Sequence, residues 1–304
     1  MKSPALLLLL VALPALGTIA APEARAAGRE RLLAHYRAVE ADLGGGSAPL
    51  PFAVDTRGGR GDAQGDVFAI FDHDFGALSR ALRAAPNWCD IVPLHLNVKS
   101  CTYREAQGQP RLTLYSGRKV YERPEDVHVL HYEFRIAEAE ENYFRVVLTA
   151  EDGPLDTRDF ALELEAMPLD SGATFVHLGY AYRYGFGTRM AMAGYFATLG
   201  SDKVGFSVVG ANAKGDPIYV AGVEGLIERN SVRYQLAIQA YLDTLAVPEE
   251  QRFERRIARW FDLTERFRPQ LFELEQEEYL RNKRRERSDQ LRLQQTLTAE
   301  TRRH

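Results

Sequence analysis

The sequence is poor in cysteine and in net positive charge, and it has few long apolar runs. Only two cysteines occur in 304 residues, which excludes a small fold held together by many disulfides. Lys and Arg total 38 against 42 Asp and Glu, and this acidic balance argues against a nucleic-acid-binding protein. Beyond the N-terminal segment, no apolar run approaches the length of about 20 residues that a transmembrane helix needs.

Familiar catalytic motifs are also missing. The sequence has no G-x-S-x-G nucleophile motif, no Walker phosphate loop and no H-E-x-x-H zinc motif. His95 or His177 could reach a pocket, but strand alternation places His177 opposite the apolar face, toward solvent. The run Asp72-His73-Asp74 is explained by helix capping and solvation more simply than by a metal ion. We therefore expect no metal and no cofactor.

Apolar residues, in contrast, are plentiful. The chain is 45% hydrophobic and 10% aromatic, which excludes disorder over most of its length. This is enough material for one large domain or two small ones.

The first 26 residues are typical of a secretory signal peptide. Lys2 gives the positive start, residues 5–16 form a short apolar core, and Ala24-Arg25-Ala26 fits the A-x-A cleavage pattern. An apolar core of about 12 residues is too short to span a bilayer. We predict cleavage after Ala26 and a periplasmic or secreted mature protein.

Export makes a disulfide between Cys89 and Cys101 possible. In one straight strand these residues would lie over roughly 30 Å apart, whereas a disulfide needs Cα atoms about 4.4–6.8 Å apart. The chain must therefore turn between them. Pro86 fits the first turn of a short helix through Cys89, and Pro93 would end that helix before a strand begins near Leu96. We predict the disulfide, with two buried free thiols as the alternative.

The region from residue 27 to 65 is predicted as an N-terminal helix and a Gly-rich loop. Residues 29–43 show helical apolar spacing, and Gly44 to Gly46 would end the helix. Residues 66–71 then indicate a strand, and Asp74 is the expected N-cap of a helix over residues 75–85.

A long antiparallel meander is expected between residues 96 and 184. Several runs alternate apolar and polar residues, as in a sheet with one buried face. The expected strands are 96–104, 111–116, 127–137, 143–150, 159–167 and 174–184.

Two helices and a hairpin follow the meander. A helix over residues 188–199 is rich in small residues, which suggests close packing. The hairpin joins residues 204–210 to residues 217–223. Asn230 or Ser231 would cap a second helix that runs to Leu245.

Pro248 marks the start of a charged amphipathic extension, residues 248–304. An aromatic line from Phe253 to Leu274 indicates helices that pack on the domain or on a partner. The basic run at residues 283–287 is interpreted as a solvated helix end, with peripheral membrane contact as the alternative.

The segments GDVFAIFDHDFGALSRALRAAPNWCDIV, the six-strand meander and NSVRYQLAIQAYLDTL occur in an order that resembles the START and related SRPBCC domains. The resemblance covers residues 66–247 and implies an α+β helix-grip fold, in which a curved antiparallel sheet wraps a C-terminal helix. It also implies an apolar cavity for a lipid-like ligand.

The predicted inward faces of the meander carry aromatic and aliphatic side chains suited to such a ligand. A plainly packed core is the alternative for the same pattern. The candidate ligand-binding residues are Tyr132, Phe134, Phe144, Phe160, Leu162, Leu178, Tyr180, Tyr182 and Tyr184.

The leading hypothesis is an exported, non-enzymatic protein that holds or carries a sterol-, hopanoid- or fatty-acyl-like molecule. One alternative is an envelope interaction protein that acts through residues 249–304. The other is an enzyme on the same scaffold, such as a cyclase or hydrolase with a histidine or carboxylate in the pocket.

Overall fold

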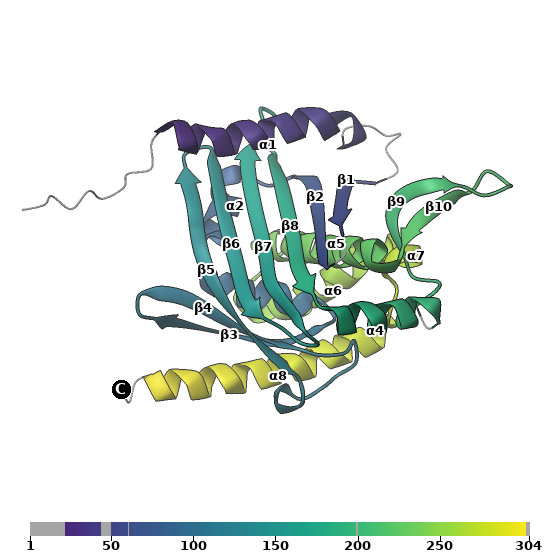
Figure 1. The fold of residues 1–304 in the computed structure, drawn as a ribbon. Helices are drawn as coiled ribbons and strands as arrows, with labels where there is room; N and C mark the ends of the chain where they lie inside the picture. Colours follow the sequence, from purple (N-terminus) through teal and green to yellow (C-terminus); the bar gives the residue numbers. More distant parts are fainter. Residues whose placement is uncertain (1–21, 44–49, 60, 199, 302–304) are drawn as a thin grey trace, which may run out of the picture.

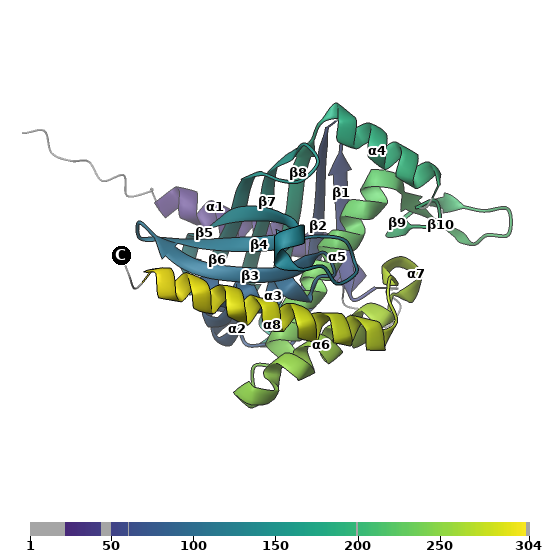
Figure 2. The ribbon, with the colours of Figure 1, turned by 90° about the horizontal axis from the view of Figure 1, so that it is seen from below.

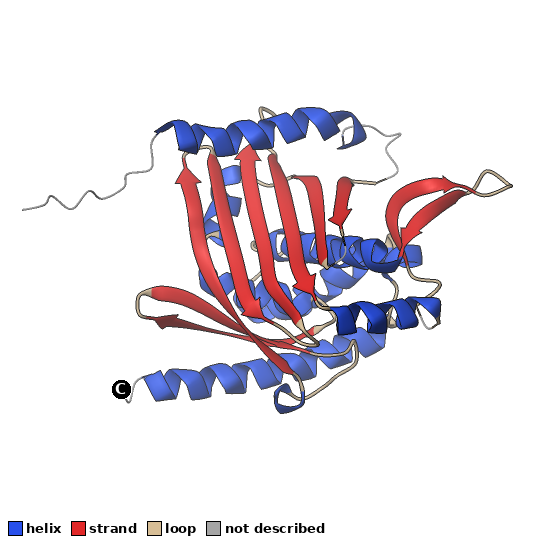
Figure 3. Ribbon diagram, viewed as in Figure 1, coloured by secondary structure: helices blue, strands red, loops and turns tan. Residues whose placement is uncertain are grey.

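An eight-stranded antiparallel sheet dominates the computed structural model, which describes residues 22–43, 50–59, 61–198 and 200–301 (Figures 1 and 3). The strand order is β1-β2-β8-β7-β6-β5-β4-β3. The strands are β1 (Phe52–Gly58), β2 (Asp62–Phe71), β3 (Val98–Ala106), β4 (Gln109–Ser116), β5 (His128–Glu140), β6 (Tyr143–Asp152), β7 (Thr157–Pro168) and β8 (Thr174–Tyr184).

The helices lie on both faces of the sheet and along one edge (Figure 2). They are α1 (Pro22–Leu43), α2 (Phe75–Leu82), α3 (Ala85–Ile91), α4 (Phe186–Ala197), α5 (Gly222–Asp243), α6 (Glu249–Glu265), α7 (Arg268–Leu271) and α8 (Gln276–Thr301), with 3-10 turns η1 (Val92–Leu94) and η2 (Pro124–Asp126). A separate hairpin consists of β9 (Val204–Ala211) and β10 (Pro217–Ala221).

The six predicted meander strands are present as β3 to β8, within a few residues of their expected bounds. The region predicted as a Gly-rich loop instead contains β1 and the start of β2. Strand β1 escaped prediction because its apolar residues, Phe52 to Val54, lie at one end and polar residues follow. It pairs only with β2, at the edge of the sheet.

The sheet wraps helix α5, which contacts β1, β2 and β8. Gly65 of β2 permits the close approach, because a Cβ there would lie 2.6 Å from Ser231 Oγ and 3.2 Å from Ile227 Cγ1. The predicted helix start at Asn230 or Ser231 is wrong, since α5 begins at Gly222. Ser231 is fully buried and its hydroxyl donates to the Gly65 carbonyl at 3.2 Å, so it is a helix–sheet contact rather than a cap. This arrangement confirms the expected α+β helix-grip fold.

Helix α1 covers part of the opposite face of the sheet and contacts β1, β2 and β7. Its Leu32 is fully buried in a second small core formed with Phe68, Tyr143, Met167 and Phe175. The predicted cleavage site after Ala26 falls within this helix, and the apolar segment before Pro22 lies outside the described residues. Signal-peptide cleavage stays a prediction.

Helix α4 packs less closely than its small residues suggest, and that prediction is wrong. None of its residues is buried, and Phe186 and Met190 are 68% and 56% exposed. Its small side chains face solvent because only one side of the helix, which includes the half-buried Met192, contacts the domain.

The C-terminal extension packs on this same domain. Ile257 and Trp260 of α6 are buried, and α6 contacts α5 and α8. Helix α8 lies along the edge strand β3, where Gln290 Oε1 accepts the N–H of Cys101 at 2.9 Å. Gln294 likewise accepts the N–H of Tyr103 at 2.8 Å and donates to its carbonyl at 2.9 Å. The helix therefore satisfies backbone groups that an open sheet edge would leave unpaired.

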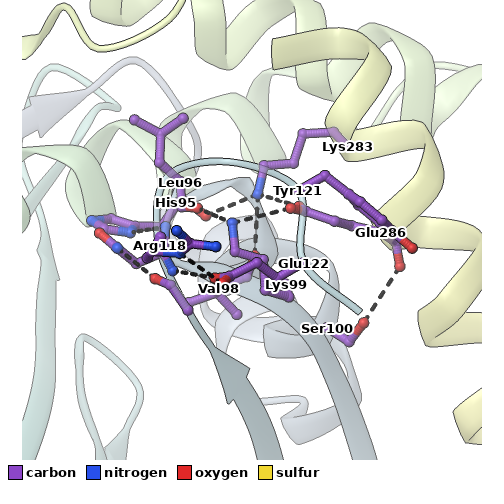
Figure 4. A network of polar contacts seen from close by, with 12 residues as sticks. His95, Leu96, Val98, Lys99, Ser100, Arg118, Tyr121, Glu122, Lys283 and Glu286 are labelled. Carbon is purple, nitrogen blue, oxygen red and sulfur yellow. Dashed lines mark hydrogen bonds and ion pairs between the residues drawn. The ribbon is translucent and has the colours of Figure 1, made fainter. Parts of the chain in front are cut away.

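The basic run at residues 283–287 lies within α8 and is only partly solvated, since Arg284 and Arg285 are exposed but other members are not. Lys283 and Glu286 are buried against η1 and β3. The Glu286 carboxylate contacts Lys283 Nζ at 2.7 Å and Lys99 Nζ at 3.1 Å (Figure 4). Lys283 also donates to the carbonyls of His95 and Val98. Burial lowers the pKa of Lys283 to about 8. The prediction failed because helical spacing puts these two residues on the inner side of α8.

The expected disulfide joins Cys89 of α3 to Cys101 of β3, with Cα atoms 4.9 Å apart. The turn that brings the sulfurs together includes η1, which contains Pro93. Among the described helices, none is long and apolar enough to cross a membrane.

Candidate functional site

A cavity of about 260 Å³ lies between the inner face of the sheet, α5 and α4. Four of the nine predicted ligand-binding residues line it: Tyr132, Phe160, Tyr180 and Tyr182. The other lining residues are His95, Asn97, Val98, Leu114, Ser116, Leu130, Pro154, Leu155, Thr157, Thr188, Met192, Asn230 and Tyr234.

The remaining five predicted residues belong to the packed core instead. Phe134 packs against Trp88 with ring centroids 6.4 Å apart, and Phe144 packs against Phe75 at 5.9 Å. Leu162, Leu178 and Tyr184 are also buried in this core and do not line the cavity. The alternation identified the inner face of the sheet, but it could not tell which part of that face the helices fill.

Aromatic rings form one wall of the cavity. Phe160 stacks on Tyr182 at 5.4 Å between centroids, and Tyr180 contacts Tyr182 at 5.8 Å and Tyr234 of α5 at 5.3 Å. Burial raises the pKa of Tyr182 to about 12 and raises the pKa of Tyr132 and Tyr180 well above the usual value. The phenols are therefore neutral, and the wall offers apolar ring surface with a few hydroxyl groups.

His95 is the histidine in the cavity lining, and η1 positions it just before β3. The imidazole stacks on Tyr234 at 4.6 Å, and its Nδ1 accepts the N–H of Asn97 at 3.1 Å. Burial and the charge of Arg233 hold the His95 pKa well below the usual range, so the ring is neutral. The accepted hydrogen bond assigns the ring proton to Nε2. Asn230 lies close enough to act on the His95 pKa in the raising direction, but in the described part of the chain no partner meets full hydrogen-bond geometry at Nε2.

A group of four cationic side chains lies behind this end of the cavity. Arg233 contacts Glu273 at 3.0 Å, Lys119 contacts it at 2.5 Å, and Lys203 contacts it at 3.5 Å. Arg229, one turn before Arg233 on α5, is 1% exposed, and its Nε and Nη1 have no hydrogen-bond partner among the described residues. Burial lowers the pKa of Arg233 to about 10 and that of Lys119 to about 8.

Sequence reasoning missed this group. The four cations come from α5 and from the segments after β4 and before β9, and the carboxylate Glu273 comes from the segment between α7 and α8. The available signal was the pair Arg229 and Arg233, four residues apart beside Asn230 and Tyr234, because charged residues at helical spacing on a buried helix need an explanation.

His177 lies on the other face of the sheet, as alternation predicts, but not in solvent. Its Nε2 contacts Asp66 at 2.8 Å and its Nδ1 contacts Glu165 at 3.0 Å. Tyr143 donates to the same Glu165. The solvent prediction is wrong because α1 crosses this face, where His35 lies 6.3 Å from the His177 ring. The two carboxylates outweigh burial and raise the His177 pKa to about 9.

No protein-family model matches the chain, and the search of curated proteins gave no match. Among solved structures, the chain is similar to the ZhuI aromatase/cyclase from Streptomyces sp. R1128, with 11% identity, 60% of this chain and 94% of that chain covered, and a TM-score of 0.37. It is also similar to major latex-like protein 151 from Panax ginseng, with 10% identity and a TM-score of 0.29. The match covers 41% of this chain and 80% of that chain.

A third similar structure is human StAR-related lipid transfer protein 5, with 10% identity, coverage of 58% and 90%, and a TM-score of 0.29. The strand order and the sheet wrapped around α5 give the chain a helix-grip fold.

Proposed function

We propose that this protein binds or carries a hydrophobic small molecule in the cavity between the sheet, α4 and α5. The cavity itself carries the proposal. Its walls are largely aromatic and aliphatic, while the rest of the inner face is filled by a well-packed core. Burying an apolar ligand against such walls is favourable at roughly 25 cal/mol per Å².

The cavity volume limits the size of the ligand. About 260 Å³ lies somewhat below the lower end for ligand pockets, about 300 Å³. At about 30 Å³ per small group, the value for a water molecule, it has room for roughly nine non-hydrogen atoms. A medium fatty-acyl chain or a single aromatic ring suits this space. A sterol or hopanoid would require the rim to move outward, and α4, which has no buried residue, is the element able to do so.

The rim supports entry of an apolar molecule. Leu155 of the β6–β7 turn lines the cavity and is 74% exposed. An apolar side chain that is exposed at the cavity rim offers a surface to an incoming apolar molecule.

The signal-peptide pattern and the Cys89–Cys101 disulfide support export to the periplasm or the exterior. We therefore propose that the mature protein is periplasmic or secreted.

The two alternatives have weaker support. A cyclase or hydrolase needs a general base in the cavity, but the described lining residues include no carboxylate and His95 Nδ1 is already hydrogen-bonded. An interaction role for residues 249–304 was motivated by their aromatic line, and Ile257, Trp260 and Phe261 are buried within this same chain.

Native mass spectrometry of protein purified without detergent or solvent tests the proposal. We expect a bound molecule, and we expect Leu130→Trp to remove it, because Leu130 lines the cavity and is 5% exposed. Val129→Trp is the matched control, since the neighbouring Val129 is 45% exposed. The proposal fails if added medium-chain acids, alcohols and aromatic compounds leave the wild type unliganded, or if Leu130→Trp retains ligand as Val129→Trp does.

A further inference from the structure

The inner end of the cavity presents hydrogen-bond donors without matching acceptors. His95 carries its proton on Nε2, which lies near the Asn230 side chain but meets no partner at full hydrogen-bond geometry among the described residues. Asn230 also lines the cavity. Its side-chain oxygen accepts from Arg233 Nη1 at 3.5 Å, which leaves the two N–H groups of the Asn230 amide for other acceptors.

Positive charge is concentrated behind these donors. Arg233 Nη1 lies 3.5 Å from Oδ1 of the cavity residue Asn230, and Arg233 and Lys119 both contact Glu273. These cations therefore lie close together and close to the cavity, and Arg229 precedes Arg233 by one turn of α5. Glu273 is the carboxylate that contacts this group. The exposed Asp202 and the phenol of Tyr195 also act on Arg229, from the side of α4.

The charge balance in this region is therefore incomplete. Lys119, Lys203, Arg229 and Arg233 bring four positive charges, whereas Glu273 and Asp202 bring two negative ones. A buried cation without a partner is strongly destabilising, by the general penalty for burying a charge. Proteins retain such a cost at sites where a ligand of opposite charge offsets it.

We propose that the ligand is an amphipathic acid, whose carboxylate or similar oxyanion lies at the His95–Asn230 end and whose apolar body lies along Tyr132, Phe160 and Tyr182. This inference rests on the proposed function and adds the charge of the ligand. The His95 and Asn230 N–H groups donate to the oxyanion, and Arg229, Arg233 and Lys119 stabilise its charge through a poorly screened interior.

Calorimetric titration with octanoate and 1-octanol tests the inference, because the two probes share one chain and differ in the charge of the head. We expect the wild type to bind octanoate about tenfold more tightly, the difference typical of one charge-assisted contact. Arg229→Met should remove this preference, by weakening octanoate binding about tenfold relative to octanol binding. Arg281→Met is the matched control, because Arg281 is exposed on α8, and it should retain the preference.

The melting temperature of the unliganded variants separates binding from folding. Arg229→Met removes a charge that has no hydrogen-bond partner at Nε or Nη1, so its melting temperature should equal or exceed that of the wild type. A large fall would assign Arg229 a structural role and overturn its part in the site. Lys119→Met, at a side chain that is 25% exposed, provides a second variant with the same expected loss of preference.

The possible outcomes distinguish the inference from the proposed function. Equal affinity of the wild type for both probes would overturn the inference that the ligand has an acidic head group, and would leave the proposed hydrophobic binding intact. Binding of neither probe overturns both. Sodium acetate that competes as strongly as octanoate would show a site for small free anions, and this would contradict an amphipathic ligand.

Discussion

His95 lies against Tyr234 with ring centroids 4.6 Å apart, and this stack joins the turn before β3 to the helix that the sheet wraps. The two residues are 139 positions apart in the sequence. The stack fixes the imidazole plane at one end of the cavity, and the Asn97 N–H fixes its tautomer. The polar end of the site is therefore positioned by packing before any ligand binds, which lowers the cost of ordering it on binding.

The Asp66–His177–Glu165 cluster predicts a pH dependence of stability. The His177 pKa is about 9 in the folded protein and about 6.5 in an unfolded chain. Because the folded value is higher, the stabilisation is complete below about pH 6.5 and is lost as the pH rises through about 9. The shift corresponds to about 3 kcal/mol.

Urea unfolding of the wild type and His177→Gln between pH 6 and 9.5 measures this contribution. The quantity to follow is the free energy of unfolding of the wild type minus that of the variant. This subtraction is needed because Lys119 and Lys283, whose pKa values are lowered to about 8, titrate with the opposite effect on stability. We expect the wild type to lose its advantage over the variant as the pH rises. A difference that stays constant across this range would contradict a protonated His177.

Removing the charge of Glu286 should lower stability much more than removing the charge of an exposed ion-pair partner. Glu286→Gln leaves the buried ammonium groups of Lys99 and Lys283 without their carboxylate. We expect a loss of about 3–5 kcal/mol in the free energy of unfolding. Glu254→Gln is the control, since Glu254 and its partner Arg284 are about half exposed, and it should change stability little. Similar small losses in both variants would show that the α8 cluster is not buried as described.

Gln290 predicts that α8 protects the sheet edge. Gln290→Ala removes the acceptor for the Cys101 N–H and the donor to the Cys89 carbonyl. Leaving buried backbone groups unpaired costs about 1–3 kcal/mol each, which chemical denaturation should detect. Hydrogen exchange at Cys101 should also become faster. Gln295→Ala, at an exposed position of α8, should leave both quantities unchanged, and equal effects of the two variants would refute the edge role.

The Cys89–Cys101 disulfide predicts a stability loss in the double variant Cys89→Ala/Cys101→Ala. The sequence separation is 12, and loop entropy for such a loop gives about 3 kcal/mol. Trp88, next to Cys89 and fully buried, reports the change through its fluorescence. Mass mapping that finds two free thiols in protein from an oxidising compartment would contradict the disulfide.

Residue periodicity predicted the elements whose burial is one-sided. Leu130, Tyr132 and Phe134 alternate with polar residues on β5, and the sheet buries that face. Periodicity failed where a second element covers the polar face. His177 has the alternation of a solvent-facing residue, and only the position of α1, more than a hundred residues earlier, removes it from water.

The candidate site could be predicted only in part, for the same reason. The aromatic wall is local to the strands, so Tyr132, Phe160, Tyr180 and Tyr182 follow from their pattern. The polar end is assembled by tertiary contacts between η1, α5 and the segment after β4. No spacing in the sequence brings Lys119 close to Arg233, because the wrapping of α5 by the sheet decides that proximity.

Intermolecular nuclear Overhauser effects from ¹³C-labelled octanoic acid to the protein test the central claim most directly. The account predicts contacts from the chain to the rings of Tyr132, Phe160 and Tyr182, with the carbons nearest the carboxylate close to His95. Contacts confined to the exposed Val208 and Val209 of the hairpin, or the absence of any contact at saturating acid, would contradict a ligand-binding cavity at this site.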